Sequence, residues 1–512
     1  MWQYQVLLIV ILSVLCFYTR IVWRLRYPYF GNDTWYHLTA AKAIRENGFR
    51  PPVKTGLHFN KSNWDYPPFL PYLLATFSSK KALRLSGFVP SIFDTLSCFI
   101  VGVLASWLPV SGLLKVDGWV TFFGLNVADS TAILLPLMGM LIWTFTPMTC
   151  IDAFQHLSPR PIGNLWMAMT IALMFLFQVD HSWLYLLPML VPVTLIYLTH
   201  KFTLQALTLL NIGLFMFTRE PWFLLVQLAG LLLAFSVTGG WYFKVLKGQL
   251  AFLNYYRKEG AEKYPGKYSL GHERLMKILK LDTTGNPWLY FLIPVLLFGP
   301  WPPSFLTAAA ITMAGSYLLT SLNPLLFLGE PERYFETAVL PLAISVPLFI
   351  LVTPAPFLDG LWLLLFAIIL LLGAMRIYRE MRGREEQMSD NSRVIEHHVD
   401  REWLEACEFM KRHPGKRIIT VAEYFQFATA YFSGKQTQGI ESAIGYGDYM
   451  DEFPATPKNI RRLVTKYKVD MVFMAKASSE GFNMDFATKV FENGRYIVYD
   501  TRGFRKRRKA FD

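Results

Sequence analysis

Long apolar runs constrain this chain more than any other feature, because they decide which solvent its helices meet. A helix that crosses a bilayer needs roughly 17 to 25 mostly apolar residues, and the sequence offers about eleven such runs. The predicted spans are 4–23, 88–109, 130–147, 163–179, 183–199, 203–218, 222–238, 287–303, 305–326, 336–353 and 359–376. Helices, not a barrel, follow from these lengths. The sequence therefore predicts a polytopic α-helical membrane protein.

The composition agrees with this prediction. Over 512 residues the chain is 53% hydrophobic and 16% aromatic, more than an ordinary soluble domain carries. The first run has no small-residue cleavage site and leads into Arg20, Arg24 and Arg26, so we interpret it as a retained span. The cysteines, which form no disulfide framework, are Cys16, Cys98, Cys150 and Cys407.

After residue 384 the pattern changes to that of a soluble domain. A linker is predicted from residue 385, with buried strands at 417–421, 469–474 and 495–500. Helical patterns at 400–413, 456–467 and 483–492 alternate with these strands. We expect a transmembrane domain over 1–384 and a small α/β domain over 385–512. No phosphate-binding glycine motif indicates a nucleotide, and the basic run 505–509 is typical of a solvated tail.

Polar residues gather on one face of the predicted bundle. Counting from a first span that runs outward, this face receives the loops 24–87, 148–162, 239–286 and 327–335 and the C-terminal domain. Loop 239–286 holds nine Lys and Arg against four acids, and the whole chain has a net charge of +13. Such charge favours anionic partners, lipid headgroups or phosphates, and nothing indicates a nucleic acid.

The side on which this face lies has two interpretations. Residues 1–19 contain no Lys or Arg, so the positive-inside rule would put the basic face in the cytoplasm. Long loops and domains follow that rule poorly, and a surface that binds phosphate is basic for another reason. We expect a plasma-membrane protein with its active face and C-terminal domain outside the cytoplasm, and the opposite orientation stays open.

The loop after the first span contains GNDTWYHLTAAKAIRENGF, residues 31–49. Asn32 or Asp33 can cap a surface helix there, and Gly48 can end it. The apolar residues predicted to share one face of this helix are Trp35, Leu38, Ala41 and Ile44. In one interpretation Asp33 is only the N-cap. In the other, a carboxylate at a helix N-terminus near the bilayer surface accepts a proton or binds a metal.

Three further segments belong to the same face. NWDYPPFLPYLLATF (63–77) follows the surface helix, FQHLSPRPIGNLW (154–166) lies in the second loop, and PERYFETAVLPLA (331–343) precedes a late span. With the acid after the first span, this order resembles the GT-C superfamily of membrane glycosyltransferases. That superfamily includes protein O-mannosyltransferases, aminoarabinose transferases and oligosaccharyltransferase catalytic subunits.

The resemblance implies transfer of a sugar from a polyprenyl-phosphate donor to an acceptor glycan, lipid or protein. Asp33 matches the essential acid, and His37 and Asp65 fall in the substrate loop. The residues expected to bind the donor phosphate are Arg333, Tyr334, Arg160 and Lys258. For Arg333 the alternative is a snorkelling residue at a helix end, and for His37 an interfacial residue.

A divalent cation, Mg²⁺ or Mn²⁺, is a further expectation from the resemblance. Asp152 and His156 are four residues apart and could join Asp33 around it, as acids of the first two external loops do in the oligosaccharyltransferase branch. The alternative is a hydrogen-bonded surface pair. The WWDYG element of that branch is absent, since the nearest strings are 240–243 and 445–449, so protein N-glycosylation is not indicated.

Two other classes of function stay open. A transporter or flippase for an anionic lipid would also be polytopic and basic, but it would favour internal repeats and midplane charges, and the sequence shows no clear repeat. A non-catalytic assembly subunit would keep the architecture without requiring Asp33. Arg219, a charge among apolar runs, falls on the opposite face in our count.

Overall fold

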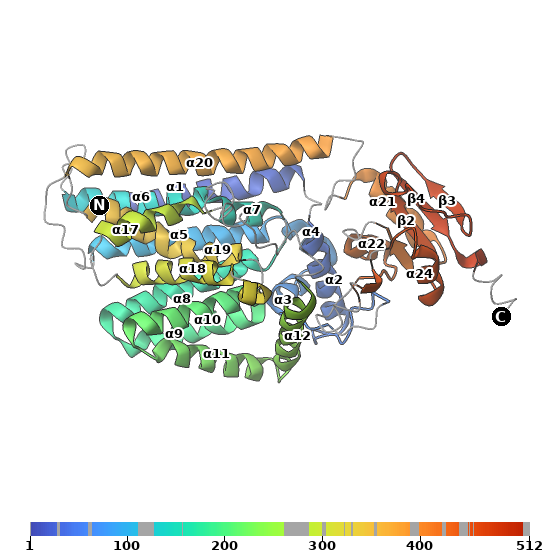
Figure 1. The fold of residues 1–512 in the computed structure, drawn as a ribbon, viewed down its shortest axis with the longest axis horizontal. Coiled ribbons are helices and arrows are strands. Elements are labelled where there is room, and N and C mark those ends of the chain that lie inside the picture. The colour runs from blue at the N-terminus through green and yellow to red at the C-terminus, as the bar shows by residue number, and fades with distance from the viewer. Residues whose placement is uncertain are drawn as a thin grey trace.

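The bundle that forms the first part of the chain consists of helices lying side by side (Figure 1). The computed structural model describes residues 2–27, 31–59, 64–110, 127–155, 157–260, 286–298, 304–321, 323–328, 331–352, 356–389, 399–421, 426–439, 449, 451–453 and 455–504. The bundle helices are α1 (Trp2–Arg26), α5 (Val89–Val110), α6 (Val127–Phe145), α8 (Arg160–Asp180), α9 (Leu186–Thr199), α10 (Lys201–Thr218), α11 (Trp222–Val237), α17 (Leu292–Phe298), α18 (Phe305–Thr320), α19 (Glu332–Val352) and α20 (Pro356–Ser389).

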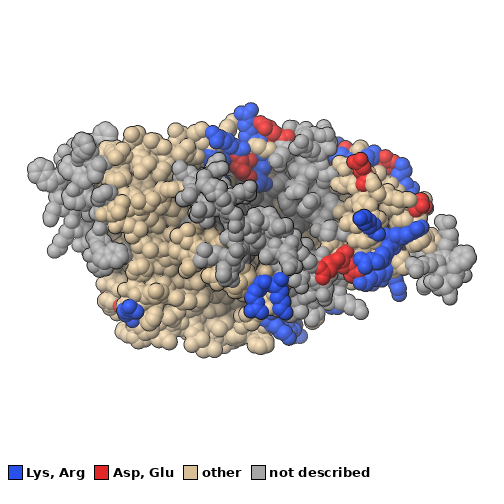
Figure 2. Space-filling model, in the orientation of Figure 1, with Lys and Arg blue, Asp and Glu red and all other residues tan. Residues whose placement is uncertain are grey.

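Shorter elements connect these helices. They are α2 (Asn32–Glu46), α3 (Phe69–Ala75), α4 (Ser79–Leu85), α7 (Pro147–Gln155), η1 (Trp183–Tyr185), α12 (Tyr242–Tyr255), η2 (Tyr256–Gly260), η3 (Pro287–Phe291) and η4 (Asn323–Leu328). Helices α2, α3, α4 and α12 lie at the end of the bundle that faces the C-terminal domain (Figure 1). Charged side chains are sparse along the visible side of the bundle and gather toward this end and over the C-terminal domain (Figure 2).

The prediction of a polytopic helical protein is confirmed. Among the described residues, five helices are long and apolar enough to cross a membrane: Trp2–Arg26, Val89–Pro109, Arg160–Asp180, Lys201–Thr218 and Gly360–Glu386. The shorter apolar helices are Thr131–Phe145, Trp183–Thr199, Trp222–Val237, Pro287–Leu297, Phe305–Thr320 and Glu336–Leu351. The count of about eleven spans stays a prediction.

Helix α20 differs most from the predicted boundaries. It has 34 residues and continues to Ser389, through the start of the segment that the sequence assigned to a linker. At 1.5 Å per residue it is about 51 Å long, well beyond the ~30 Å hydrocarbon core. The ion pairs Arg382–Glu386 and Arg384–Glu380, each spaced i,i+4, stabilise its polar end. The domain boundary at residue 384 stays a prediction.

A buried ion pair joins the first helices. Arg20 Nε donates to Asp94 Oδ2 at 2.7 Å, and both side chains are almost fully buried. Trp143 Nε1 donates to the other carboxylate oxygen at 3.2 Å, and the Arg20 guanidinium also donates to the Thr144 carbonyl at 2.5 Å. The pair therefore ties α1 to α5 and α6. Arg20, which the sequence pattern places in the basic run that ends the first span, is an interior residue with its charge compensated.

The C-terminal α/β domain is present. Its sheet has the order β1-β2-β4-β3, with β1 parallel to β2 and the other neighbours antiparallel. Its elements are α21 (Arg401–Arg412), β1 (Ile418–Thr420), α22 (Gln426–Ser433), α24 (Ile460–Lys466), β2 (Met471–Ala475), η6 (Lys476–Ser478), β3 (Thr488–Glu492) and β4 (Tyr496–Asp500). The helix predicted over 483–492 is wrong. Strand β3 occupies 488–492 as a largely exposed edge, so its few apolar residues did not show a clear alternation.

We predict that Asp94→Asn destabilises the bundle by about 3–5 kcal/mol, because it leaves the Arg20 charge buried without its partner. Unfolding of the protein in detergent measures this loss. Glu385→Gln, which removes the exposed Arg26–Glu385 pair, is the matched control and should cost less than ~1 kcal/mol. Equal effects of the two substitutions would contradict a structural role for the buried pair.

Candidate active site at the end of the helix bundle

Helix α2 begins with backbone geometry that only glycine adopts easily. Gly31 occupies the N-cap position with φ 92°, and the helix starts at Asn32. Asp33 therefore lies inside the first turn and is not the N-cap residue, so the capping interpretation is wrong for it. Its side chain is exposed. The helix ends at Glu46, followed by Gly48 at φ 63°, as the sequence predicted.

The apolar face of α2 is buried as predicted. Trp35, Leu38, Ala41 and Ile44 all belong to one hydrophobic cluster. Thr34 Oγ1 accepts a hydrogen bond at 3.0 Å from the backbone N–H of Leu157, in the second loop. The helix is thus fixed to the membrane domain while Asp33 stays open to solvent.

Tyr66 is the centre of the polar cluster around Asp33. Tyr36 and His37 each pack edge-to-face with the Tyr66 ring, with 5.4 Å between the ring centroids in both pairs. Burial raises the pKa of the Tyr66 hydroxyl, the Asp33 carboxylate raises it further, and Arg160 at the start of α8 opposes them. Asp33 and Arg160 therefore lie within electrostatic reach of one hydroxyl. Tyr66 was not predicted as a site residue, although it stands in the aromatic segment 63–77 beside Pro67.

His37 is buried one turn after Asp33. Its Nδ1 has no hydrogen-bond partner among the described residues. Burial lowers the pKa of the imidazole to about 4, and the nearby Asp33 carboxylate only partly opposes this shift. His37 is therefore a neutral ring at physiological pH, packed against Tyr66.

Asp65 was predicted to belong to the substrate loop, and that role stays a prediction. It is buried, and a Cβ added to Gly248 of α12 would lie 2.3 Å from its Oδ2. The lack of a side chain at Gly248 leaves room for this carboxylate. Lys201 interacts electrostatically with it. Asp65 thus joins α12 to the first residue of α10.

Lys201 and Arg333 bring two cations to this end of the bundle. Lys201 Nζ lies 5.4 Å from the centroid of the Tyr66 ring and 5.7 Å from that of Phe252. Arg333 Cζ lies 5.9 Å from the ring centroid of Phe202, the neighbour of Lys201. Lys201 was not predicted as a site residue, although the short segment 200–202 between two predicted spans lies on the polar face.

The other residues predicted to bind phosphate occupy distinct environments. Tyr334 is buried, and its hydroxyl lies 3.4 Å from both Gln205 Oε1 and the Leu328 carbonyl, so it ties α19 to α10 and η4. Arg160 is half-buried, and Lys258 is exposed in η2. Arg219 ends α10 at the opposite end from Lys201, as predicted.

A buried polar pair lies deeper between α8 and α19. Asn164 Nδ2 donates to Glu336 Oε1 at 2.5 Å. Each residue is one turn further along its helix than Arg160 and Arg333, respectively. This pair was not predicted, because both residues lie at the start of predicted spans, where polar residues are common.

The predicted metal ligands are only partly described. Asp152 lies in α7, but its side chain and the whole of His156 lie outside the described residues. Among the residues whose side chains are described, no three His, Cys, Asp or Glu residues are grouped to hold an ion. The metal set therefore stays a prediction. Residues 445–448 of the GYGDY string also lie outside the described part.

The sequence matches no protein-family model and no curated protein. Solved membrane glycosyltransferases share the fold. The Archaeoglobus fulgidus oligosaccharyltransferase with a tethered acceptor peptide superposes with a TM-score of 0.57 at 12% identity, over 97% of this chain and 74% of that one. AglB from the same organism, in complex with an inhibitory peptide and a dolichol-phosphate, superposes with a TM-score of 0.57 at 11% identity. The superposition covers 92% of this chain and 69% of that one.

The aminoarabinose transferase ArnT supplies a second kind of relative. The enzyme from Cupriavidus metallidurans, bound to undecaprenyl phosphate, superposes with a TM-score of 0.56 at 11% identity, over 97% of this chain and 98% of that one. Both kinds of neighbour are GT-C glycosyltransferases. The expected GT-C fold is thereby confirmed.

We predict that His37 makes the protein acid-sensitive. The folded protein keeps this ring neutral down to about pH 4, whereas the unfolded chain protonates it below its usual pKa of 6.5. The contribution of His37 to the free energy of unfolding is therefore fully present above pH 6.5. It falls by up to ~3 kcal/mol as the pH drops to 4. His37→Gln should flatten the decline of Tm with acid, while His181→Gln, at an exposed site, should not. Parallel Tm profiles would contradict this assignment.

Proposed function

We propose that this protein is a GT-C glycosyltransferase that moves a sugar from a polyprenyl-phosphate-linked donor to an acceptor at the extracytoplasmic membrane surface. The observation that carries the proposal is the exposed Asp33 carboxylate in the first turn of α2, which acts electrostatically on the same Tyr66 hydroxyl as Arg160. Glycosyltransferase neighbours crystallised with dolichol-phosphate and undecaprenyl phosphate support it through their shared fold.

The reaction requires one proton acceptor and one stabilised leaving group. The oxygen or nitrogen of the acceptor attacks C1 of the sugar while the bond from C1 to the phosphate oxygen breaks. That oxygen keeps the bonding electron pair, and the lipid phosphate leaves as an anion. Asp33 accepts the proton that the acceptor loses, a role that suits a solvent-accessible carboxylate at a helix N-terminus.

Cations at the ends of the bundle helices would stabilise the phosphate. Arg333 and Lys201 lie in the first turns of α19 and α10, where a lipid tail can remain in the bilayer while its headgroup reaches the surface. Arg160, which acts electrostatically on the Tyr66 hydroxyl together with Asp33, would connect the phosphate and proton-transfer regions. Lys258 is exposed and would contribute charge at the rim. Tyr334 would hold Arg333 in place through its contact with Gln205.

A divalent cation would add positive charge beside the leaving group. Asp33, Asp152 and His156 supply the carboxylate and imidazole groups that such an ion accepts. One oligosaccharyltransferase neighbour was crystallised with zinc and sulfate. For this chain the metal, the plasma-membrane location and the division into domains 1–384 and 385–512 belong to the proposal.

We predict that Asp33→Asn lowers the rate of sugar release from a polyprenyl-phosphate donor by about 10²–10⁴-fold, because asparagine cannot accept the proton. Single-turnover assays with purified protein in lipid nanodiscs measure this loss. Asp180→Asn, at the other end of α8, is the control and should keep full activity. Undiminished turnover in Asp33→Asn would remove Asp33 from the mechanism. Donor translocation without transfer would identify a lipid transporter instead.

We predict that Lys201→Met weakens binding of dolichyl phosphate by about tenfold to a hundredfold, because a charge-assisted contact is lost. Arg219→Met changes the same kind of residue at the opposite end of α10 and should leave the dissociation constant unchanged. Binding to protein in nanodiscs, measured by calorimetry, compares the two. Equal binding by both variants would show that the Lys201 ammonium does not contact the phosphate.

A further inference from the structure

We infer that the C-terminal domain positions the Asp33 helix from outside the membrane, by binding both α2 and the strand-like segment that follows it. The docking interface consists of Trp35, Tyr36 and residues 57–59 of the first loop, and Phe427, Tyr431, Phe432 and residues 436–439 of the domain. Three independent kinds of contact support this inference.

Aromatic rings make the first contact, between α2 and α22. Trp35, fully buried, packs against Phe432 and Tyr431 with ring centroids 4.9 and 5.8 Å apart. The edge of Tyr36 meets Phe427 at 5.4 Å. Such pairs bury a large apolar area and favour defined geometries, so they fix both the position and the rotation of α2. Asp33 is only two residues before Trp35 on this helix.

Backbone hydrogen bonds make the second contact. Phe59 N–H donates to the Thr437 carbonyl at 3.0 Å, and Thr437 N–H donates to the Leu57 carbonyl at 2.9 Å. The domain segment 436–439 pairs on its other side with β1, because Ile418 N–H donates to the Gln436 carbonyl at 2.8 Å. The first loop is thus joined by one parallel β-bridge, His58 to Thr437, to a segment that a second parallel bridge, Arg417 to Gln436, joins to the residue before β1. This is backbone pairing of the kind by which an extended segment docks on a sheet edge.

The side chain of His58 makes the third contact. Its buried ring lies within hydrogen-bond distance of Thr437, with 3.0 Å between Nδ1 and Oγ1, and its edge meets Phe427 at 5.1 Å. Gly439 leaves room for it, since a Cβ at that position would lie 2.4 Å from the ring. The domain therefore has a fitted site for one side chain of the first loop.

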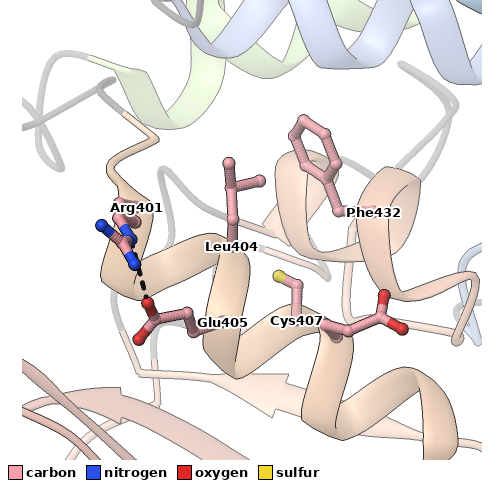
Figure 3. Close-up of a pocket in the computed structure, with 6 residues that line it drawn as sticks. Arg401, Leu404, Glu405, Cys407 and Phe432 are labelled. Atoms are coloured by element: carbon pink, nitrogen blue, oxygen red, sulfur yellow. Dashed lines mark hydrogen bonds and ion pairs between the residues drawn. The ribbon is translucent and has the colours of Figure 1, made fainter.

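The interface complements the attachment of α2 to the membrane domain. The Thr34 hydroxyl binds Leu157 on the membrane side, and the aromatic contacts hold the helix on the other side. Phe432 also borders a groove of about 370 Å³ between α21 and α22, across from Leu404 (Figure 3). Leucine at position 432 would keep the apolar wall of this groove while losing the ring that meets Trp35.

The test uses the full chain in nanodiscs with Phe432→Leu and Gly439→Ala. Both variants should speed amide hydrogen exchange of α2 by about tenfold, because they loosen its outer support, while β2 and β4 amides keep wild-type exchange. The matched controls are Phe491→Leu, which alters a ring pair 5.0 Å apart within the domain, and Gly503→Ala, which meets no neighbouring atom within 4 Å. Neither control should change α2 exchange.

An activity measurement then separates positioning from general stability, and this arm alone rests on the proposed function. Both variants should lower kcat while leaving the donor KM unchanged, because Arg333 and Lys201 do not belong to α2. Wild-type α2 exchange in Gly439→Ala, or a raised KM with unchanged kcat, would overturn the inference. If the β2 amides of Phe432→Leu also exchange fast, that substitution has loosened the domain itself, and α2 exchange in Gly439→Ala then decides whether the domain supports α2. An inactive wild type would refute only the proposed function, since the exchange measurement still tests the docking.

Discussion

The hydrocarbon core of a bilayer offers no hydrogen-bond partner to a polar group, and the arrangement of the helices and polar residues follows from this constraint. Backbone groups are satisfied inside helices, and the buried Arg20 and Asp94 side chains satisfy each other and the carbonyls around them. The residues proposed to exchange a proton or bind an anion, Asp33, Lys201 and Arg333, lie at helix ends. The polar cluster around Asp33 consequently lies where α2, α8, α10 and α19 begin.

Helix α2 has the character of a soluble-protein helix, yet it stands against a membrane bundle. It remains ordered because both of its sides are covered, one by the bundle end and the other by the C-terminal domain. Asp33 can stay exposed because Trp35, Leu38 and Ile44 anchor the helix through its other faces. A catalytic carboxylate needs both a fixed helix and access to solvent, since a side chain on a mobile segment cannot hold an acceptor in the reactive geometry.

Hydropathy predicted the bundle because each span is a local signal of many residues. The buried face of α2 was also local, and Trp35 through Ile44 appeared at helical spacing. Lys201, Tyr66 and Glu336 were missed because their significance arises from contacts between distant parts of the chain. Lys201 lies over the Tyr66 ring, and Glu336 accepts a hydrogen bond from Asn164, 172 positions away. Strand β3 was mistaken for a helix because an edge strand with mixed exposure carries no clear period. The fold class was thus readable from the sequence, whereas the composition of the site depended on long-range packing.

The pairing of His58 with Thr437 joins residues 379 positions apart, and this separation has a consequence for biosynthesis. A ribosome adding 5–20 residues per second needs about 20 to 80 s to make the intervening chain. During that interval the Trp35 face of α2 emerges before its aromatic partners exist. The nascent protein therefore passes through a stage in which the membrane helices can be inserted but the Asp33 helix lacks its outer support. Completion of the polar cluster around Asp33 would then be among the last events of synthesis.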